Sequence, residues 1–171
     1  MNRRELLQSM LAIAAAGMAG RSAAADAVRQ ERSVAGFDRV VVHGVIDLVV
    51  TQGAREQLFV TAEPRLMAKI VTRVERRTLI IETVGDFRTD RKLLVELTLR
   101  ELHHLEADGS ADIRVERLRS DKLDLELAGN ADLTARRLAL DALKLRASGS
   151  ASVTLGGSTG SQTVQLGGSA D

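Results

Sequence analysis

The chain has 171 residues, which is enough for one ordinary domain and too few for two sizeable ones. Lys and Arg number 24 and Asp and Glu 23, so the net charge of +1 provides no polybasic field to attract nucleic acid or an anionic membrane. The absence of Cys, Trp and Tyr excludes disulfide frameworks, thiolate metal sites and cysteine nucleophiles, and it leaves few aromatic platforms for bases or sugars.

Residues 1–25 have the pattern of an export signal. Residues 1–4 are basic, residues 6–20 are uncharged and rich in Ala and Leu, and small residues follow, with cleavage expected after Ala25. The apolar stretch of about fifteen residues is shorter than the roughly twenty that span hydrocarbon, so we expect a cleaved signal peptide rather than an uncleaved anchor. Arg3-Arg4 resembles the start of a twin-arginine signal, and the general secretory route is the alternative.

This signal predicts an exported protein that lies in the periplasm, on the cell surface or outside the cell. We expect a short linker over residues 26–33 and a single domain over residues 34–171, with no membrane span in the mature chain.

The second half of the chain repeats with a period of about twenty residues. Four segments align on glycines that are followed by small and acidic residues, namely Gly109, Gly129, Gly149 and Gly168. Apolar residues stand four positions before each glycine, at Leu105, Leu125, Leu145 and Val164. Others stand two positions before it, at Ala107, Leu127, Ala147 and Leu166. Apolar and polar residues therefore alternate on both sides of the glycines.

A side-chain period of two predicts strands, and a sequence period of twenty predicts units that stack on one another. A helical repeat is disfavoured because the leucines of Lys122–Leu127 would point around most of a helix. The sequence therefore predicts an all-β, single-domain parallel β-solenoid, a β-helix that we expect to be right-handed, with rungs of about 20 residues. The expected bend positions are Gly44, Gly109, Asp112, Gly129, Asp132, Gly149, Gly168 and Asp171.

The first half of the chain follows the same scheme loosely. Val40 and Val42 are expected to point inward, and twenty residues later Val60, Ala62 and Ala68 fit the same columns. Six or so rungs would form a rod about 30 Å long, with the irregular first rungs as a cap.

The sequence resembles the head GIN domain of auto-transporter adhesins, an exported β-solenoid-like family with no established biochemical activity. The resemblance covers residues 33–171 and rests on Val34–Asp38 leading into Val40–Val42, on Gly44–Gly53, and on the Gly-Ser-Ala-Asp segments. It implies adhesion to a surface partner.

Two arrangements of polar residues are candidates for chemical sites. Asp47, Asp112, Asp132 and Asp171 would form a partial acidic column that could bind calcium. Ser152 interrupts the column, and aspartates in tight bends bond their own turn backbone, so we expect no metal site.

Ser110, Asp112 and His103 or His104 could be drawn as a nucleophile, an orienting acid and a base. Serines in every bend are more simply turn formers, and adjacent histidines on a strand point to opposite faces. We therefore expect no catalytic residue and no cofactor, and we interpret Arg73, Arg76 and Arg77 as a solvated segment.

The sequence favours a non-catalytic exported envelope or cell-surface domain that binds a surface protein or glycan. The alternatives are a purely structural envelope scaffold and, third, a carbohydrate-active β-helix enzyme, for which no cluster of carboxylates beside a sugar groove is visible. Asp171 falls inside an expected bend, so we also expect a domain truncated at its C-terminus that associates end to end.

Overall fold

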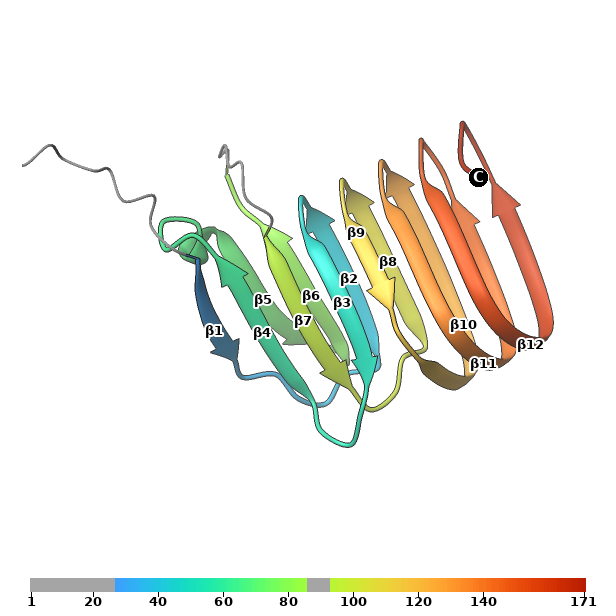
Figure 1. The fold of residues 1–171 in the computed structure, drawn as a ribbon, viewed down its shortest axis with the longest axis horizontal. Coiled ribbons are helices and arrows are strands. Elements are labelled where there is room, and N and C mark those ends of the chain that lie inside the picture. Colours follow the sequence, from blue (N-terminus) through green and yellow to red (C-terminus); the bar gives the residue numbers. More distant parts are fainter. Residues whose placement is uncertain (1–26, 86–92) are drawn as a thin grey trace, which may run out of the picture.

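The computed structural model describes residues 27–85 and 93–171, and these residues form an all-β structure (Figure 1). The expected signal peptide over residues 1–25 lies outside the described residues. Among the described residues, no helix has the length and apolar character needed to cross a membrane.

Twelve strands and one 3-10 turn follow one another in the described part of the chain. They are β1 (Val28–Arg32), β2 (Arg39–Gly44), β3 (Asp47–Gln52), β4 (Gln57–Ala62), the turn η1 (Met67–Lys69), β5 (Ile70–Glu75), β6 (Thr78–Thr83), β7 (Leu94–Leu99), β8 (His104–Gly109), β9 (Asp112–Val115), β10 (Leu118–Gly129), β11 (Asp132–Ala147) and β12 (Ser152–Leu166).

All twelve strands belong to one sheet that curls back on itself. Its order is β1-β4-β7-β3-β9-β11-β10-β8-β2-β6-β5, with β12 added to β11. The turning point is β11, because residues 132–135 pair with β9 while residues 138–147 pair with β10. Two limbs therefore face each other, with β4, β7, β3 and β9 in front and β6, β2 and β8 behind in Figure 1. The result is a nearly closed, barrel-like sheet.

The prediction of a parallel β-solenoid is wrong, because the strand pairing is mixed. β1 pairs with β4, β4 with β7, and β5 with β6 in antiparallel ladders. The parallel pairs β2–β6, β2–β8, β3–β7 and β10–β11 lie among them. A β-helix of twenty-residue rungs would contain parallel neighbours only.

The prediction failed in the first half of the chain. Val60 was expected to stack on Val40 twenty residues earlier, but Val40 pairs with Leu79 and Leu105 while Val60 pairs with Val95. Ala68, expected to point inward, is exposed in η1. Extrapolation of the regular spacing from the second half missed the hairpin β5–β6, which interrupts the spacing.

Within the segment expected to be a linker, Val28–Arg32 form β1. The β1 ladder pairs Val28 with Ala62 and Arg32 with Leu58. A strand forms here because β4 would otherwise expose a row of unpaired backbone groups at the edge of the sheet.

The core lies between the two limbs and consists of alternate side chains from both. Leu48, Ile113 and Leu133 point inward from one limb, and Leu105 and Leu125 point inward from the other; all five are buried. Every buried side chain among the described residues is apolar. The polar residues that alternate with this core are therefore left for the two outer faces.

The strands of the second half are held in register at their bends by glycines. Positive φ angles occur at Gly44, Gly109, Gly129, Gly149 and Gly168. A Cβ atom on Gly129 would lie 2.6 Å from the carbonyl oxygen of Gly109, so the bend backbones approach one another more closely than a side chain allows.

Candidate functional site

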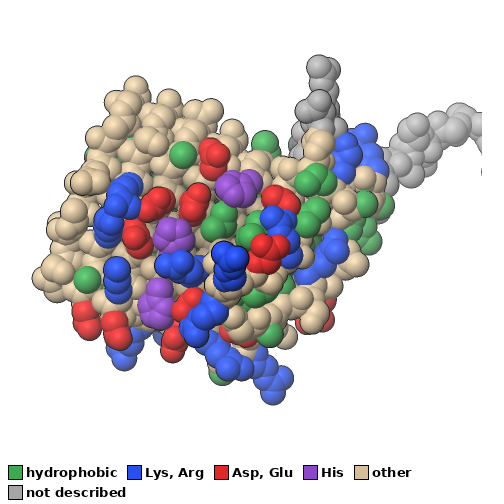
Figure 2. Space-filling model, turned by 180° about the vertical axis from the view of Figure 1, so that it is seen from behind, with side chains coloured by type: hydrophobic (Ala, Val, Ile, Leu, Met, Phe, Trp, Pro, Cys, Tyr) green, Lys and Arg blue, Asp and Glu red, His purple; other side chains and the backbone are tan. Residues whose placement is uncertain are grey.

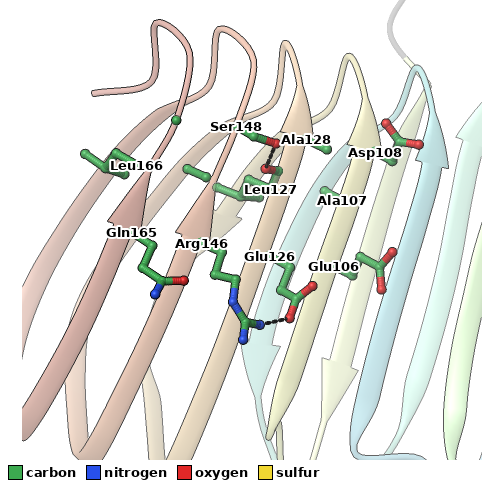
Figure 3. Close-up of a pocket in the computed structure, with 12 residues that line it drawn as sticks. Glu106, Ala107, Asp108, Glu126, Leu127, Ala128, Arg146, Ser148, Gln165 and Leu166 are labelled. Atoms are coloured by element: carbon green, nitrogen blue, oxygen red, sulfur yellow. Dashed lines mark hydrogen bonds and ion pairs between the residues drawn. The ribbon is translucent and has the colours of Figure 1, made fainter.

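The outer face of β8, β10, β11 and β12 carries a shallow groove with a volume of about 460 Å³ (Figure 3). Its lining residues are Glu106, Ala107, Asp108, Glu126, Leu127, Ala128, Arg146, Ala147, Ser148, Gln165, Leu166 and Gly167. None of them is aromatic.

The groove follows from two outward columns of side chains. Parallel pairing places Glu106 beside Glu126, Glu126 beside Arg146, and Arg146 beside Gln165. Two residues further along, the second row begins with Asp108, which pairs with Ala128, and continues with the small residues Ser148 and Gly167. A row of long side chains next to a row that is short at three of its four positions leaves a groove that crosses the strands.

The groove is rich in carboxylates. Glu106, Asp108 and Glu126 line it together with a single cation, Arg146, whose guanidinium donates a hydrogen bond to Glu126. His104 Nε2 lies 3.5 Å from a carboxylate oxygen of Glu106. Figure 2 shows this face, where acidic, basic and histidine side chains gather over the middle of the sheet. The groove therefore offers several hydrogen-bond acceptors and few free donors.

A second polar cluster lies at the opposite bends of the sheet. Arg77 donates a hydrogen bond of 2.6 Å to Asp38 Oδ2, and His103 Nδ1 lies 3.3 Å from the same oxygen. The Arg77 guanidinium holds the pKa of Asp38 below its usual value; burial opposes this shift, and the bond to His103 adds to it. The backbone carbonyl of Asp38 also accepts the N–H of His103 at 2.8 Å, so the cluster ties β2 to the start of β8.

The expected acidic column is partly assembled. Asp47 pairs with Asp112, Asp112 with Asp132, and Asp132 with Ser152, one per strand. Asp112 also lies 3.9 Å from Arg114. Among the described residues, no three His, Asp or Glu side chains are grouped as a metal site would require.

The structure does not bring together the serine and histidines that were weighed as a catalytic set. Ser110 follows β8, where its N–H bonds the carbonyl of Gly44, whereas His103 and His104 lie at the start of that strand. A six-residue strand separates them by roughly 20 Å. His103 contacts Asp38 and His104 contacts Glu106 instead.

Sequence reasoning missed both the groove and the Asp38 cluster. The groove had a signal, because Glu106, Glu126, Arg146 and Gln165 all stand three positions before an aligned glycine. The apolar columns at two and four positions before the glycine, which predicted the strands, point inward and so do not reveal the groove. The cluster had no such signal, since Arg77 and Asp38 are brought together only by the β2–β6 pairing.

Solved structures with the same fold come from bacterial proteins. An adhesin of Bacteroides fragilis, described as putative, matches 78% of this chain with a TM-score of 0.75 and 22% sequence identity. A second such adhesin, from Parabacteroides distasonis, matches 83% of the chain with a TM-score of 0.59 and 21% identity, and the chain covers 70% of its length. A structure from the same organism called a putative lipid binding protein matches 82% of the chain, and 73% of its own length is covered, with a TM-score of 0.63 and 16% identity.

The chain spans 64% of the length of the Bacteroides fragilis adhesin. No curated protein matches the chain. The family model described as "Putative auto-transporter adhesin, head GIN domain" matches residues 36–171, which confirms the resemblance seen in the sequence. The chain therefore belongs to the auto-transporter adhesin head GIN domain family.

Proposed function

We propose that this chain is a non-catalytic, exported binding module that contacts a cell-surface protein or glycan through the groove on β8, β10, β11 and β12. Membership of an adhesin domain family supports a binding role. The single observation that supports the location is the groove itself, where polar side chains from four adjacent strands stand in register around small residues.

The chemistry of the groove favours an extended ligand that donates hydrogen bonds. Carboxylates repeated on neighbouring strands, about 4.8 Å apart, present acceptors at regular intervals to sugar hydroxyls or to the donors of a protein surface. One structural relative is called a lipid binding protein, but three carboxylates and Arg146 line this groove beside its apolar residues, and an acyl chain would cover these charges without giving them hydrogen-bond partners.

An enzymatic role is less well supported. Arg146 is engaged by Glu126, and the hydroxyl of Ser148 lies 3.4 Å from the carbonyl oxygen of Leu127. Both groups make hydrogen bonds within the sheet. They do not form a nucleophile and a base, which must lie within hydrogen-bond distance of each other.

The proposal is tested by filling the groove and measuring binding. The chain is first screened on arrays of surface glycans and purified envelope proteins. Ala128→Arg then places a long side chain in the groove, while Thr51→Arg places the same side chain on the outer face of β3, in the other limb. We expect Ala128→Arg to weaken binding at least about tenfold and Thr51→Arg to leave it unchanged. Equal effects of the two substitutions on affinity would show that the ligand does not bind in the groove.

A further inference from the structure

The bends at the lower end of the sheet in Figure 1 carry an excess of positive charge. They contain nine Lys and Arg side chains and six Asp and Glu side chains, whereas the whole chain has a net charge of only +1. Lys and Arg side chains also gather at the lower end of Figure 2, where the molecule is seen from behind. We call this surface the basic edge, and it consists of residues 33–38, 53–56, 76–77, 100–103, 116–122 and 136–141.

Arginines from different bends are neighbours along the basic edge. Arg77, from the turn between β5 and β6, and Arg100, which follows β7, both line a hollow of about 220 Å³. The side-chain amide of Gln52 donates hydrogen bonds to the backbone carbonyl oxygens of Arg100 at 2.9 Å and of Arg119 at 3.0 Å. These contacts place the three arginines in one continuous row.

The row continues at the corner where β9 leads into β10 and where β11 turns. Arg117 stands beside Arg137 there, because the strand pairs on both sides of the corner are in register. Arg77 is paired with Asp38, and a guanidinium nitrogen of Arg137 lies 3.5 Å from Glu116. The exposed arginines of the edge whose side chains have no ion pair or hydrogen bond within the described part of the chain are Arg55, Arg76, Arg100, Arg117, Arg119 and Arg136.

Three arginines of the basic edge have a backbone conformation that favours glycine. Among the described residues other than glycine, positive φ angles occur only at Arg76, Arg77 and Arg137, with values of 47°, 65° and 55°. A side chain in this region costs conformational energy that Gly avoids, so the fold alone would favour Gly or Asn at these positions. Strained residues concentrate at functional sites, and this strain therefore supports a binding role for the arginines independently of their charge.

We propose that the basic edge is a second binding surface, distinct from the groove, and that it holds an acidic polysaccharide along its row of arginines. Guanidinium groups form paired hydrogen bonds with oxyanions, and carboxylate and sulfate are the oxyanions of such polymers. Glu56 and Glu101 line the hollow beside Arg77 and Arg100, where they can accept hydrogen bonds from sugar hydroxyls. A ligand that carries both acid groups and hydroxyls matches this mixture of side chains.

A lipid surface and a nucleic acid match the basic edge less well. The exposed large apolar side chains of the described residues all lie outside the edge, so none of them can enter a membrane there. The aromatic residue of the edge, Phe37, is buried and cannot stack on a base.

Binding of the 171-residue chain to fluorescently labelled dextran sulfate, polygalacturonate and neutral dextran tests the proposal. We expect binding to at least one of the two acidic polymers, no binding to dextran, and an affinity that falls as salt is raised. The two acidic polymers distinguish sulfate from carboxylate as the recognised group. Failure of both to bind would overturn the proposal, and so would tighter binding to phosphatidylglycerol vesicles than to either polymer.

Two double variants with the same loss of charge locate the binding surface. Arg117→Gln with Arg119→Gln removes two charges from the basic edge, and affinity for the acidic polymer should fall at least about tenfold. Arg114→Gln with Lys144→Gln removes two charges from the outer faces of β9 and β11, and affinity should change less than about threefold. Equal losses in the two variants would overturn the proposal, because overall charge would then account for the binding.

Arg76→Gly tests the argument from backbone strain. The substitution removes a positive charge and relieves the strain at φ 47°. The variant should therefore bind the acidic polymer more weakly than the unmodified chain and unfold at the same or a higher temperature. A clearly lower melting temperature, or unchanged binding, would contradict the proposal.

Discussion

Ala131 and Asp132 show how one step along a strand separates the core from the solvent. Ala131 is fully buried, and Asp132 is exposed. Ala131→Asp should lower the free energy of unfolding by about 3 kcal/mol or more, because an unpaired charge would be buried. Asp132→Asn should change it by less than about 0.5 kcal/mol, since the side chain is exposed. Denaturant unfolding of both variants checks this, and equal effects would mean that the assignment of inside and outside is wrong.

Asp38 links stability to pH. Its pKa lies below the ordinary value of 3.8 because Arg77 donates to the carboxylate. A depressed pKa stabilises the folded state above the unfolded pKa, and this contribution is lost as pH falls through the folded pKa. Asp38→Asn should therefore lower the free energy of unfolding at pH 7. The loss should be only about 1 kcal/mol, because Arg77 is exposed and solvent screens its interaction with Asp38.

The difference between wild type and Asp38→Asn should shrink as pH is lowered below 4 and falls through the depressed pKa of Asp38, because the carboxyl group then becomes neutral, as the amide is. Urea unfolding at several pH values measures it. A difference that stays constant across this range would show that the carboxylate charge contributes nothing.

Among the elements, the bends of the second half depend on close backbone approach as well as on positive φ. Gly36 and Gly129 both have positive φ, 75° and 82°, but a Cβ on Gly36 would meet nothing within 4 Å while one on Gly129 would clash with Gly109. We expect Gly36→Ala to cost about 1 kcal/mol from conformation alone and Gly129→Ala about 3 kcal/mol. Thermal and denaturant unfolding of the two variants measures these losses of stability. Similar losses in both variants would indicate that the bend backbones can move apart to admit a Cβ atom.

The strands that sequence reasoning could place are those with a regular period. In β8, β10 and β11 the inward columns predicted from Leu105, Leu125 and Leu145 are buried and in register. The β5–β6 hairpin could not be placed, because its two-residue turn is Arg76-Arg77, both at positive φ. Such turns ordinarily carry Asn or Gly, so the usual turn signal is absent from the sequence.

The curl of the whole sheet limits how much of the groove can be predicted from the sequence. The outward positions of Glu126 and Arg146 follow from strand alternation and were predictable. Their gathering with small residues into a groove depends on the strand register and on where β11 turns from one limb to the other. The parallel pairing of β8, β10, β11 and β12 sets that register.

The stability of the whole domain should not depend on calcium. The aspartates at Asp47, Asp112 and Asp132 contribute one carboxylate per strand, Ser152 breaks the column, and Asp112 is already near Arg114. A ligand bound only by the folded state must raise the melting temperature by mass action. We expect no shift in millimolar calcium. An upward shift of several degrees that a chelator reverses would establish a site.

We propose that this adhesin-family domain binds its partner through the groove on β8, β10, β11 and β12. The most direct measurement is the affinity of the tightest array ligand for the unmodified chain, Ala128→Arg and Thr51→Arg, with all three shown to melt at similar temperatures. We expect at least a tenfold loss of affinity, about 1.4 kcal/mol, for Ala128→Arg and wild-type affinity for Thr51→Arg. Wild-type affinity in Ala128→Arg, or a loss confined to Thr51→Arg, would contradict it.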